Sequence, residues 1–351
     1  MRLRARNGTY GLQTIRVANS KRVAWTGLTI VLGVLVLMGC SVPRSPEVVV
    51  YTSVDQPHSE PVLEAFEQRS GVRVRAIYDI EATKTTGLIS RLVAERDRPQ
   101  ADVFWSSEIA QTLRLKEQGV LAPYASSAAE DIPAAYRDPD AYWTGFGLRA
   151  RILIVNTNRL DSTDYPDSIF DLLDPKWQPG EVGFANPLFG TTATHAAALY
   201  AVLGAQAAYS YFHALHDQGA RVVDGNSVVR DMVASGDLTV GLTDTDDAAV
   251  AVREGKPVKI IFPDQDGLGT LFIPNTVALV AGGPNPEQGR TLIDFLLGEE
   301  VETVLIEQNF LCASVRSAGD ASAAKAMDVS WTDVAAQIEG AKSALKELLL
   351  H

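Results

Sequence analysis

The stretch Gly241-Leu-Thr-Asp-Thr-Asp-Asp247 joins a short apolar run, Leu238–Leu242, to a segment, Ala248–Arg253, that has the pattern of a helix. This order predicts a strand-to-helix turn. The turn carries three carboxylates and two hydroxyls. One or two such groups are enough to cap a helix, whereas clustered carboxylates repel one another unless a positive partner neutralises them. We therefore favour a ligand site over a simple helix cap.

Strands and helices alternate along the rest of the chain. β-branched, apolar or alternating runs predict strands at 47–53, 72–77, 101–105, 151–156, 182–185, 259–262 and 271–281. Apolar residues at helical spacing predict helices at 61–70, 85–96, 109–118, 168–173, 193–203, 207–218, 227–235, 286–297, 299–307 and 331–350. This order predicts parallel sheet with helices on both faces, arranged as two α/β lobes.

Five polar clusters fall at the predicted strand ends or helix starts, at 51–55, 79–85, 106–108, 190–192 and 241–247. Each cluster alone is equally well explained as a turn or a helix cap. Ligands of open parallel sheets bind outside the carboxyl ends of the strands. We therefore expect the clusters to face one cleft if the two lobes close on each other.

The clusters differ in the charge that they would attract. Their acidic members favour a cation and are Asp55, Glu81, Glu108, Asp244, Asp246 and Asp247. Gly190-Thr191-Thr192 stands at a helix N-terminus, where free N–H groups and the helix dipole favour an anion. Arg149 and Arg151 flank the predicted central strand, so one of them can neutralise an anion in the cleft or form a surface salt bridge.

The N-terminal segment has the features of a lipoprotein signal peptide. Residues 1–39 contain six basic residues and no acidic one, followed by an apolar core that ends Leu37-Met38-Gly39-Cys40. The apolar run is shorter than the roughly 20 residues of a membrane-spanning helix. We therefore expect cleavage before Cys40, a lipid on Cys40, and a short tether over 40–46.

Charge and cysteine content limit the partners. Removal of the six basic residues of 1–39 would lower the formal charge from −12 to −18, which makes nucleic acid an improbable ligand. With Cys40 lipidated, Cys312 is the one cysteine left, so no intrachain disulfide is expected.

Seven short motifs together give a family resemblance. They are Val49-Val-Tyr51, Ala65-Phe-Glu67 with Gly71-Val-Arg-Val74, Ala101-Asp-Val-Phe104 with Glu108, Gly119-Val-Leu-Ala-Pro123, Arg149-Ala-Arg-Ile-Leu-Ile-Val155, Asp171-Leu-Leu-Asp-Pro-Lys-Trp177 and Asp294-Phe-Leu296. Over about 47–310 the chain resembles the substrate-binding lipoproteins of bacterial ABC importers, specifically the periplasmic ferric-binding proteins. The resemblance implies a type II periplasmic-binding-protein fold with two α/β lobes, lobe 1 at 47–147 and 272–351 and lobe 2 at 148–271.

The resemblance also implies partners and a ligand set. Expected partners are the permease and ATPase subunits of an importer, a small ligand, and the membrane through the lipid anchor. The protein is expected to be a monomer, exported to the periplasmic or extracellular face.

Ferric-binding relatives use a His, a Glu and two adjacent Tyr as metal ligands. Glu108 matches the Glu, Asp55 stands in the place of the His, and Thr245-Asp246 stands in the place of the Tyr pair. The expected metal ligands are therefore Asp55, Glu108, Asp244 and Asp246, and the expected ligand-binding residues are Asp55, Glu81, Thr83, Glu108, Arg149, Gly190, Thr191, Thr192 and Thr245.

Three functions remain open from the sequence. The first is capture of a metal ion, ferric iron or another cation, with a synergistic anion at Gly190–Thr192. The second is capture of a small zwitterion such as an aminophosphonate, whose ammonium would meet the carboxylates and whose phosphonate would meet the helix N-terminus. The third is catalysis, for which His195 is a candidate base, but no nucleophile is placed beside it. We therefore expect a binding protein, not an enzyme.

We predict that the mature protein begins at Cys40 and carries lipid there, because the lipobox follows an apolar run. Mass spectrometry of the native N-terminus tests this prediction. An intact, unmodified Met1 on the protein isolated from membranes would contradict it.

Overall fold

The computed structural model describes residues 45–79, 86–317 and 324–350. Within these ranges the chain forms one compact unit from Ser45 onward. The signal segment, Glu81 and Thr83 lie outside the described residues. No helix in the described ranges is long and apolar enough to cross a membrane.

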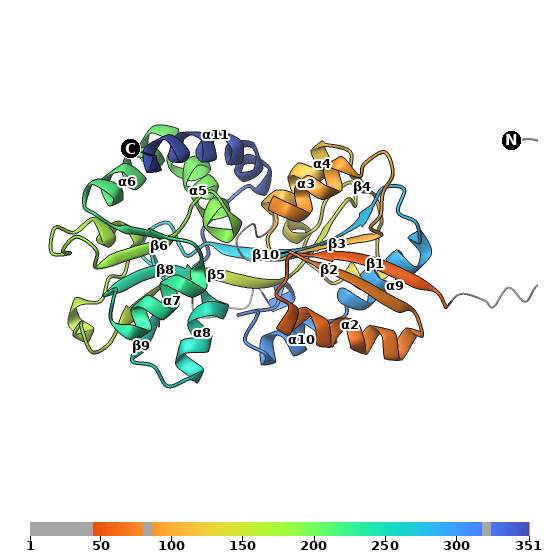
Figure 1. The fold of residues 1–351 in the computed structure, drawn as a ribbon, viewed down its shortest axis with the longest axis horizontal. Coiled ribbons are helices and arrows are strands. Elements are labelled where there is room, and N and C mark those ends of the chain that lie inside the picture. The colour runs from red at the N-terminus through yellow and green to blue at the C-terminus, as the bar shows by residue number, and fades with distance from the viewer. Residues whose placement is uncertain (1–44, 80–85, 318–323, 351) are drawn as a thin grey trace, which may run out of the picture. The chain divides into compact units, whose positions relative to one another are not determined.

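The strands divide between two lobes that share one long strand (Figure 1). In lobe 1, β1 (Glu47–Thr52) pairs in parallel with β2 (Arg73–Tyr78) and β3 (Val103–Ser106), and β10 (Phe272–Val280) runs antiparallel to β3. The short β4 (Leu121–Ala122) pairs with β10. In lobe 2, β6 (Val182–Ala185) lies between β7 (Arg221–Val223) and β8 (Val240–Asp244), all parallel.

The shared strand is β5 (Thr144–Asn156), and all of its residues are buried. Its first half pairs with β10 of lobe 1, and its second half pairs with β8 and with β9 (Val258–Ile261) of lobe 2. Both lobes are therefore connected by continuous, fully buried backbone, and the side chains of β5 stand at the boundary between them.

Helices cover the sheets of both lobes (Figure 1). Lobe 1 carries α2 (Gln56–Ser70), α3 (Thr86–Ala94), α4 (Ala110–Glu117), α9 (Pro286–Leu296) and α10 (Glu299–Glu307), and lobe 2 carries α5 (Gly190–Leu203), α6 (Ala205–Asp217), α7 (Asn226–Ser235) and α8 (Thr245–Arg253). Short 3-10 helices occur at Ser127–Ala129, Ala134–Tyr136, Ser162–Asp164, Ile169–Leu173 and Val315–Ser317.

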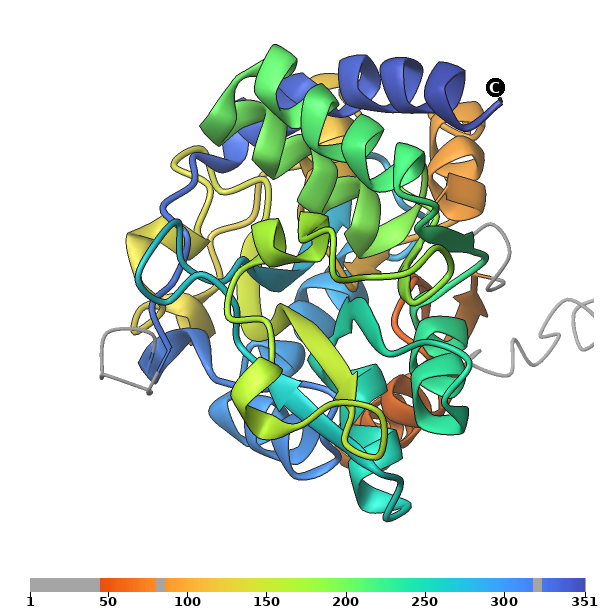
Figure 2. The ribbon, with the colours of Figure 1, turned by 90° about the vertical axis from the view of Figure 1, so that its left-hand side faces the viewer.

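The last helix, α11 (Trp331–Leu349), contacts both lobes. Its apolar face packs on α5 and α6 of lobe 2, and its buried residues there are Val334, Ile338, Ala341, Leu345 and Leu348. It also packs on α4 of lobe 1, where Arg114 pairs with Glu339 at 3.1 Å. Figure 2 shows this blue helix beside the green helices of lobe 2. The terminal helix is therefore not confined to lobe 1, where the sequence placed it.

The predicted elements are present, and most differences are at their ends. Helices α5 and α8 begin at Gly190 and Thr245, three residues before their predicted starts, because Gly, Thr and Asp are common in the first turn even though they are weak helix formers. The predicted helix at 168–173 is a 3-10 helix, Ile169–Leu173. The sheet is mixed rather than wholly parallel, because β5 and β10 run against their neighbours.

We predict that Gly241→Ala destabilises lobe 2. A Cβ on Gly241 of β8 would lie 2.3 Å from Cγ1 of Val229 and 3.1 Å from Cγ2 of Val233, both on α7. Such overpacking costs about 1–3 kcal/mol. The control is Gly340→Ala in α11, where nothing lies within 4 Å and the helix gains up to about 1 kcal/mol. Denaturant unfolding measures both, and equal stability of the two variants would contradict the close packing of α7 on β8.

Candidate functional site

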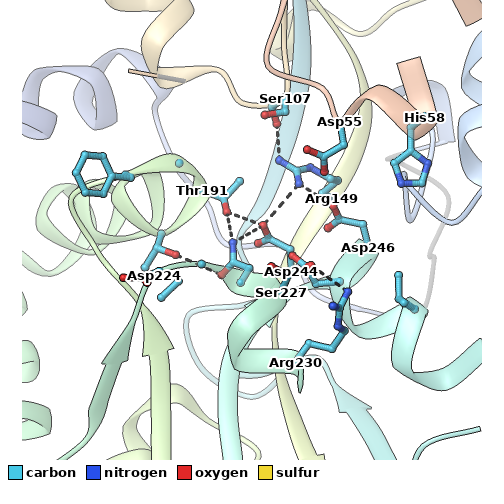
Figure 3. A pocket seen from close by; sticks show the side chains of 18 of the residues that line it. Asp55, His58, Ser107, Arg149, Thr191, Asp224, Ser227, Arg230, Asp244 and Asp246 are labelled. Carbon is cyan, nitrogen blue, oxygen red and sulfur yellow. Dashed lines mark hydrogen bonds and ion pairs between the residues drawn. The ribbon is translucent and has the colours of Figure 1, made fainter. Parts of the chain in front are cut away.

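A pocket of about 350 Å³ opens between the lobes, and we call it the interlobe pocket. Lobe 1 contributes the start of α2 and Ser107, lobe 2 contributes the starts of α5, α7 and α8, and β5 contributes Arg149. Its lining is Asp55–His58, Ser107, Arg149, Ala185, Asn186, Phe189–Thr192, Asp224–Ser227, Arg230, Asp244, Asp246, Asp247 and Val250. Figure 3 shows the acidic side chains grouped around Arg149.

Four helices, α2, α5, α7 and α8, begin at this pocket. Their N-cap residues are Asp55, Phe189, Gly225 and Asp244, and none of the four caps its helix through a side-chain hydrogen bond. The first N–H groups of a helix have no partner within the helix, and the dipole places partial positive charge there. The starts of α5 and α7, which bear no acidic residue in the first turn, are therefore suited to an anion, and we call them the anion wall.

Asp244 is held by three side chains around the end of β8. Arg151 Nη1 donates to its Oδ1 at 2.6 Å, and Thr191 Oγ1 and Asn226 Nδ2 donate to its Oδ2 at 2.5 and 2.9 Å. Burial alone would raise the pKa of Asp244, but the charges of Arg151 and Arg149 outweigh it and lower the pKa. The carboxylate therefore stays ionised, and it links β5, α5 and α7 instead of capping α8.

Arg149 lies at the centre of the acidic side chains and contacts both lobes. Its Nη1 donates to Asp246 Oδ2 at 2.9 Å and lies 3.6 Å from Asp244 Oδ2, while its Nη2 donates to the carbonyl of Ser107 at 2.7 Å. Burial lowers the pKa of Arg149, but the charges of Asp246, Asp244 and Asp55 raise it above its usual value. The guanidinium is therefore a fixed positive charge joining lobe 1 to lobe 2.

Three carboxylates on the lobe 2 side are close enough to share a cation. Oxygen atoms of Asp244, Asp246 and Asp247 all lie within 4.8 Å of one another. Asp247 also lies 3.7 Å from Arg230. Hard cations prefer such clustered oxygen ligands. The site therefore combines a potential cation cluster with the anion wall.

The structure brings together most of the residues predicted from sequence. Asp55, Arg149, Gly190, Thr191, Thr192, Asp244 and Asp246 all line the interlobe pocket. Thr245 does not; its hydroxyl accepts a hydrogen bond from the backbone N–H of Ala150 at 3.1 Å.

Glu108 requires a correction, because it is buried outside the pocket lining. Its carboxylate accepts hydrogen bonds from the N–H groups of Ala110 and Gln111 at 2.7 and 3.2 Å and from Thr194 Oγ1 at 2.8 Å. Burial raises the pKa of Glu108 despite these bonds. Glu108 therefore caps the start of α4 and contacts α5 of lobe 2, and it does not join the other predicted ligands.

Sequence reasoning missed one wall of the pocket. Asp224 lies just before α7, Asn226, Ser227 and Arg230 belong to α7 itself, and His58 belongs to the first turn of α2. The signal for the first group was the run Asp224-Gly-Asn-Ser227 before a predicted helix, which follows a strand, β7, too short to be recognised. No described residue of the lining is a tyrosine.

Two lobes joined by a shared strand and enclosing a polar pocket define a two-lobed ligand-binding protein. The chain belongs to the family described as bacterial extracellular solute-binding protein, whose model matches residues 98–336. The chain is similar to "Iron uptake protein A1" of Synechocystis sp., with 26% identity over 307 residues that cover 81% of this chain and 83% of the relative. It is also 26% identical over 248 residues to the "Putative 2-aminoethylphosphonate-binding periplasmic protein" of Salmonella typhi, covering 70% of each chain.

Among solved structures, iron-bound HitA from Pseudomonas aeruginosa superimposes with a TM-score of 0.76, at 20% identity, over 86% of this chain and 99% of that chain. This likeness shows the fold, which is the type II periplasmic-binding-protein fold. The predicted fold class and the predicted solute-binding family are therefore confirmed, whereas the lipid anchor stays a prediction.

His195 lies in the buried part of α5 and does not line the pocket. Burial, reinforced by the positive charge of Arg151, lowers the pKa of His195 to about 3, although Asp244 opposes the shift. The ring is therefore neutral at physiological pH and lies outside the pocket lining. This position is that of a packed core histidine and gives the catalytic alternative no support.

We predict that His195 makes folding stability depend on pH. Because its folded pKa lies below the unfolded value of about 6.5, the unfolded chain takes up a proton that the native state does not, and stability falls as the pH drops from about 6.5 toward 3. The loss approaches about 1.4 kcal/mol per pH unit.

Urea unfolding at a series of pH values measures this contribution. His195→Gln should lose it, whereas His213→Gln on the exposed surface of α6 should keep the dependence of the unsubstituted protein. The same pH dependence in His195→Gln and the unsubstituted protein would contradict the prediction.

Proposed function

We propose that the protein is the substrate-binding component of an ABC importer and that its interlobe pocket captures a metal cation, ferric iron first, together with an anion. The observation that carries the proposal is the meeting of the Asp244–Asp246–Asp247 carboxylates with the uncapped starts of α5 and α7 in one pocket. A cation and an anion bound side by side would each neutralise one wall.

The positions of the carboxylates suit a cleft that closes on its ligand. Asp55 belongs to lobe 1, whereas Asp244 and Asp246 belong to lobe 2, and all three face the same pocket (Figure 3). A cation that bridges Asp55 to either lobe 2 carboxylate would favour the closed form over the open one, since ligands shift an equilibrium toward the state that they bind better. Gly190, Thr191 and Thr192 would hold the accompanying anion at the start of α5.

Relatives support iron as the first choice. One relative is named an iron uptake protein, and another, from Neisseria meningitidis, is named the major ferric iron-binding protein. Among the described residues, the pocket lining offers carboxylates but no phenolate. A bound ferric ion would therefore lack the colour that tyrosinate ligands give.

The cellular setting follows from the same proposal. Export, cleavage before Cys40 and lipid attachment there would hold the protein on the periplasmic or extracellular face of the membrane as a monomer. Closure of the lobes would then present the loaded form to permease and ATPase subunits. The protein would bind and release its ligand without chemical change, so we propose no enzymatic activity.

A second candidate is a small zwitterion such as an aminophosphonate. Arg149 and Arg151 already form ion pairs with Asp246 and Asp244. The negative charge of these carboxylates is therefore partly neutralised without a highly charged cation. The pocket of about 350 Å³ falls within the range of roughly 300–1,000 Å³ typical of small-molecule sites. An ammonium could then meet Asp55 or Asp247 while the phosphonate occupies the starts of α5 and α7, and one relative is named for 2-aminoethylphosphonate.

We predict that protein purified without chelator, or incubated with ferric citrate, carries about one metal ion per chain by elemental analysis. A bound ligand at a hundredfold excess over Kd raises the free energy of unfolding by about 2.7 kcal/mol. The corresponding increase in melting temperature should therefore disappear on chelation and in Asp246→Ala, and it should shrink in Thr192→Ala, which alters only the anion wall.

The zwitterion gives the opposite pattern. Protein that stays free of metal after incubation with ferric citrate and divalent ions, but is stabilised by 2-aminoethylphosphonate in the presence of chelator, would replace the first candidate with the second. In that case Thr192→Ala should weaken binding as severely as Asp246→Ala.

A further inference from the structure

The position that a cation would take in the interlobe pocket is held by a protein side chain. Arg149 Nη1 lies 2.9 Å from Asp246 and 3.6 Å from Asp244, and the negative charge of Asp55 in the opposite lobe also raises the pKa of Arg149. These three carboxylates are the members of the predicted metal set that line the pocket. The guanidinium therefore already neutralises the group that a cation would need.

The same guanidinium supplies a link between the lobes. Its Nη2 donates to the carbonyl of Ser107 in lobe 1 while its Nη1 binds Asp246 in lobe 2. Its guanidinium carbon lies over the ring of Phe310, 5.3 Å from the ring centroid. Arg149 is also buried, with 3% of its surface exposed. Arg149 thus does what a bridging ligand would do: it neutralises the carboxylates and it connects the two lobes.

We infer that Arg149 is an internal counter-cation that must leave Asp244 and Asp246 before a metal ion can bind them, and that it thereby lowers the affinity for every cation, so that weakly attracted cations do not bind. The inference rests on the proposed metal-binding function and deepens it by naming the side chain that a bound cation must displace. A guanidinium and a metal ion cannot share these oxygen atoms, because their positive charges repel strongly at such short distances in a buried site.

Displacement of Arg149 sets a minimum charge for a cation that binds. The attraction between a monovalent cation and the carboxylates is no stronger than the attraction of the guanidinium that it replaces. A divalent cation is attracted somewhat more strongly than the guanidinium. A trivalent cation is attracted most strongly and can compensate for the lost contacts to Asp246 and Ser107.

The test compares cation binding by the unsubstituted protein and by Arg149→Gln. Tb³⁺ luminescence titration reports occupancy of an oxygen-ligated site directly, and Ca²⁺ competes for the same site as the divalent probe. We expect Arg149→Gln to bind Tb³⁺ at least tenfold more tightly than the unsubstituted protein and to bind Ca²⁺ more tightly by a similar factor, because either cation must break the same Arg149 contacts. Arg159→Gln is the matched control, because Arg159 pairs with Glu181 outside the pocket; it should bind as the unsubstituted protein does.

A second measurement covers the case in which Arg149→Gln fails to fold. In nitrogen-15 NMR spectra of the unsubstituted protein, the guanidinium signal that is missing from Arg149→Lys belongs to Arg149. Addition of the diamagnetic ion Ga³⁺ should shift this signal and accelerate its exchange with water, because the contacts to Asp246 and Ser107 break.

The outcomes separate the inference from the function on which it rests. If the unsubstituted protein binds Tb³⁺ and Arg149→Gln binds it equally or more weakly, or if Ga³⁺ binds without changing the Arg149 signal, the inference is wrong and the proposed metal function stands. If neither protein binds Tb³⁺, Ga³⁺ or ferric citrate, both are wrong.

Discussion

The site depends on the pairing of two arginines of β5 with two aspartates at the end of β8 and the start of α8. Arg151 stands directly opposite Asp244 in the β5–β8 register, and Arg149, two residues earlier on the same face, reaches Asp246. All four residues are buried. Removal of one partner from such a pair leaves an uncompensated buried charge, which costs about 3–5 kcal/mol. The ion pairs therefore fix the carboxylates in place in the absence of a ligand.

This pairing joins the fold to its function because β5 belongs to both lobes. Its first half completes the sheet of lobe 1 and its second half that of lobe 2, so Arg149 stands where the lobes meet. The helices that follow β6, β7 and β8 direct their N-termini at the same point. A cluster of negative charge, a fixed positive charge and a wall of N–H groups thus lie within one pocket, and this combination suits a ligand that carries charges of both signs.

The fold was largely predictable, because the alternation of apolar runs and helical patterns sets the order of strands and helices. The predicted residues at strand ends, such as Asp55, Thr191 and Asp244, reach the pocket because topology brings those ends together. The sequence-based predictions fail where contacts between distant segments determine the position of a side chain. Glu108 also follows a strand, but its side chain turns back onto the start of α4. The pairing of Arg151 with Asp244 depends on strand register, which no local pattern specifies. The start of α7 was overlooked because β7 has only three residues.

Crystals grown with ferric citrate and measured at the iron absorption edge test the central claim most directly. The account predicts one anomalous peak within bonding distance, roughly 2.0–2.6 Å, of oxygen atoms from at least two of Asp55, Asp244, Asp246 and Asp247, with the Arg149 guanidinium no longer on Asp246. Absence of an anomalous peak from the pocket, with Arg149 still bound to Asp246 and Ser107, would contradict it.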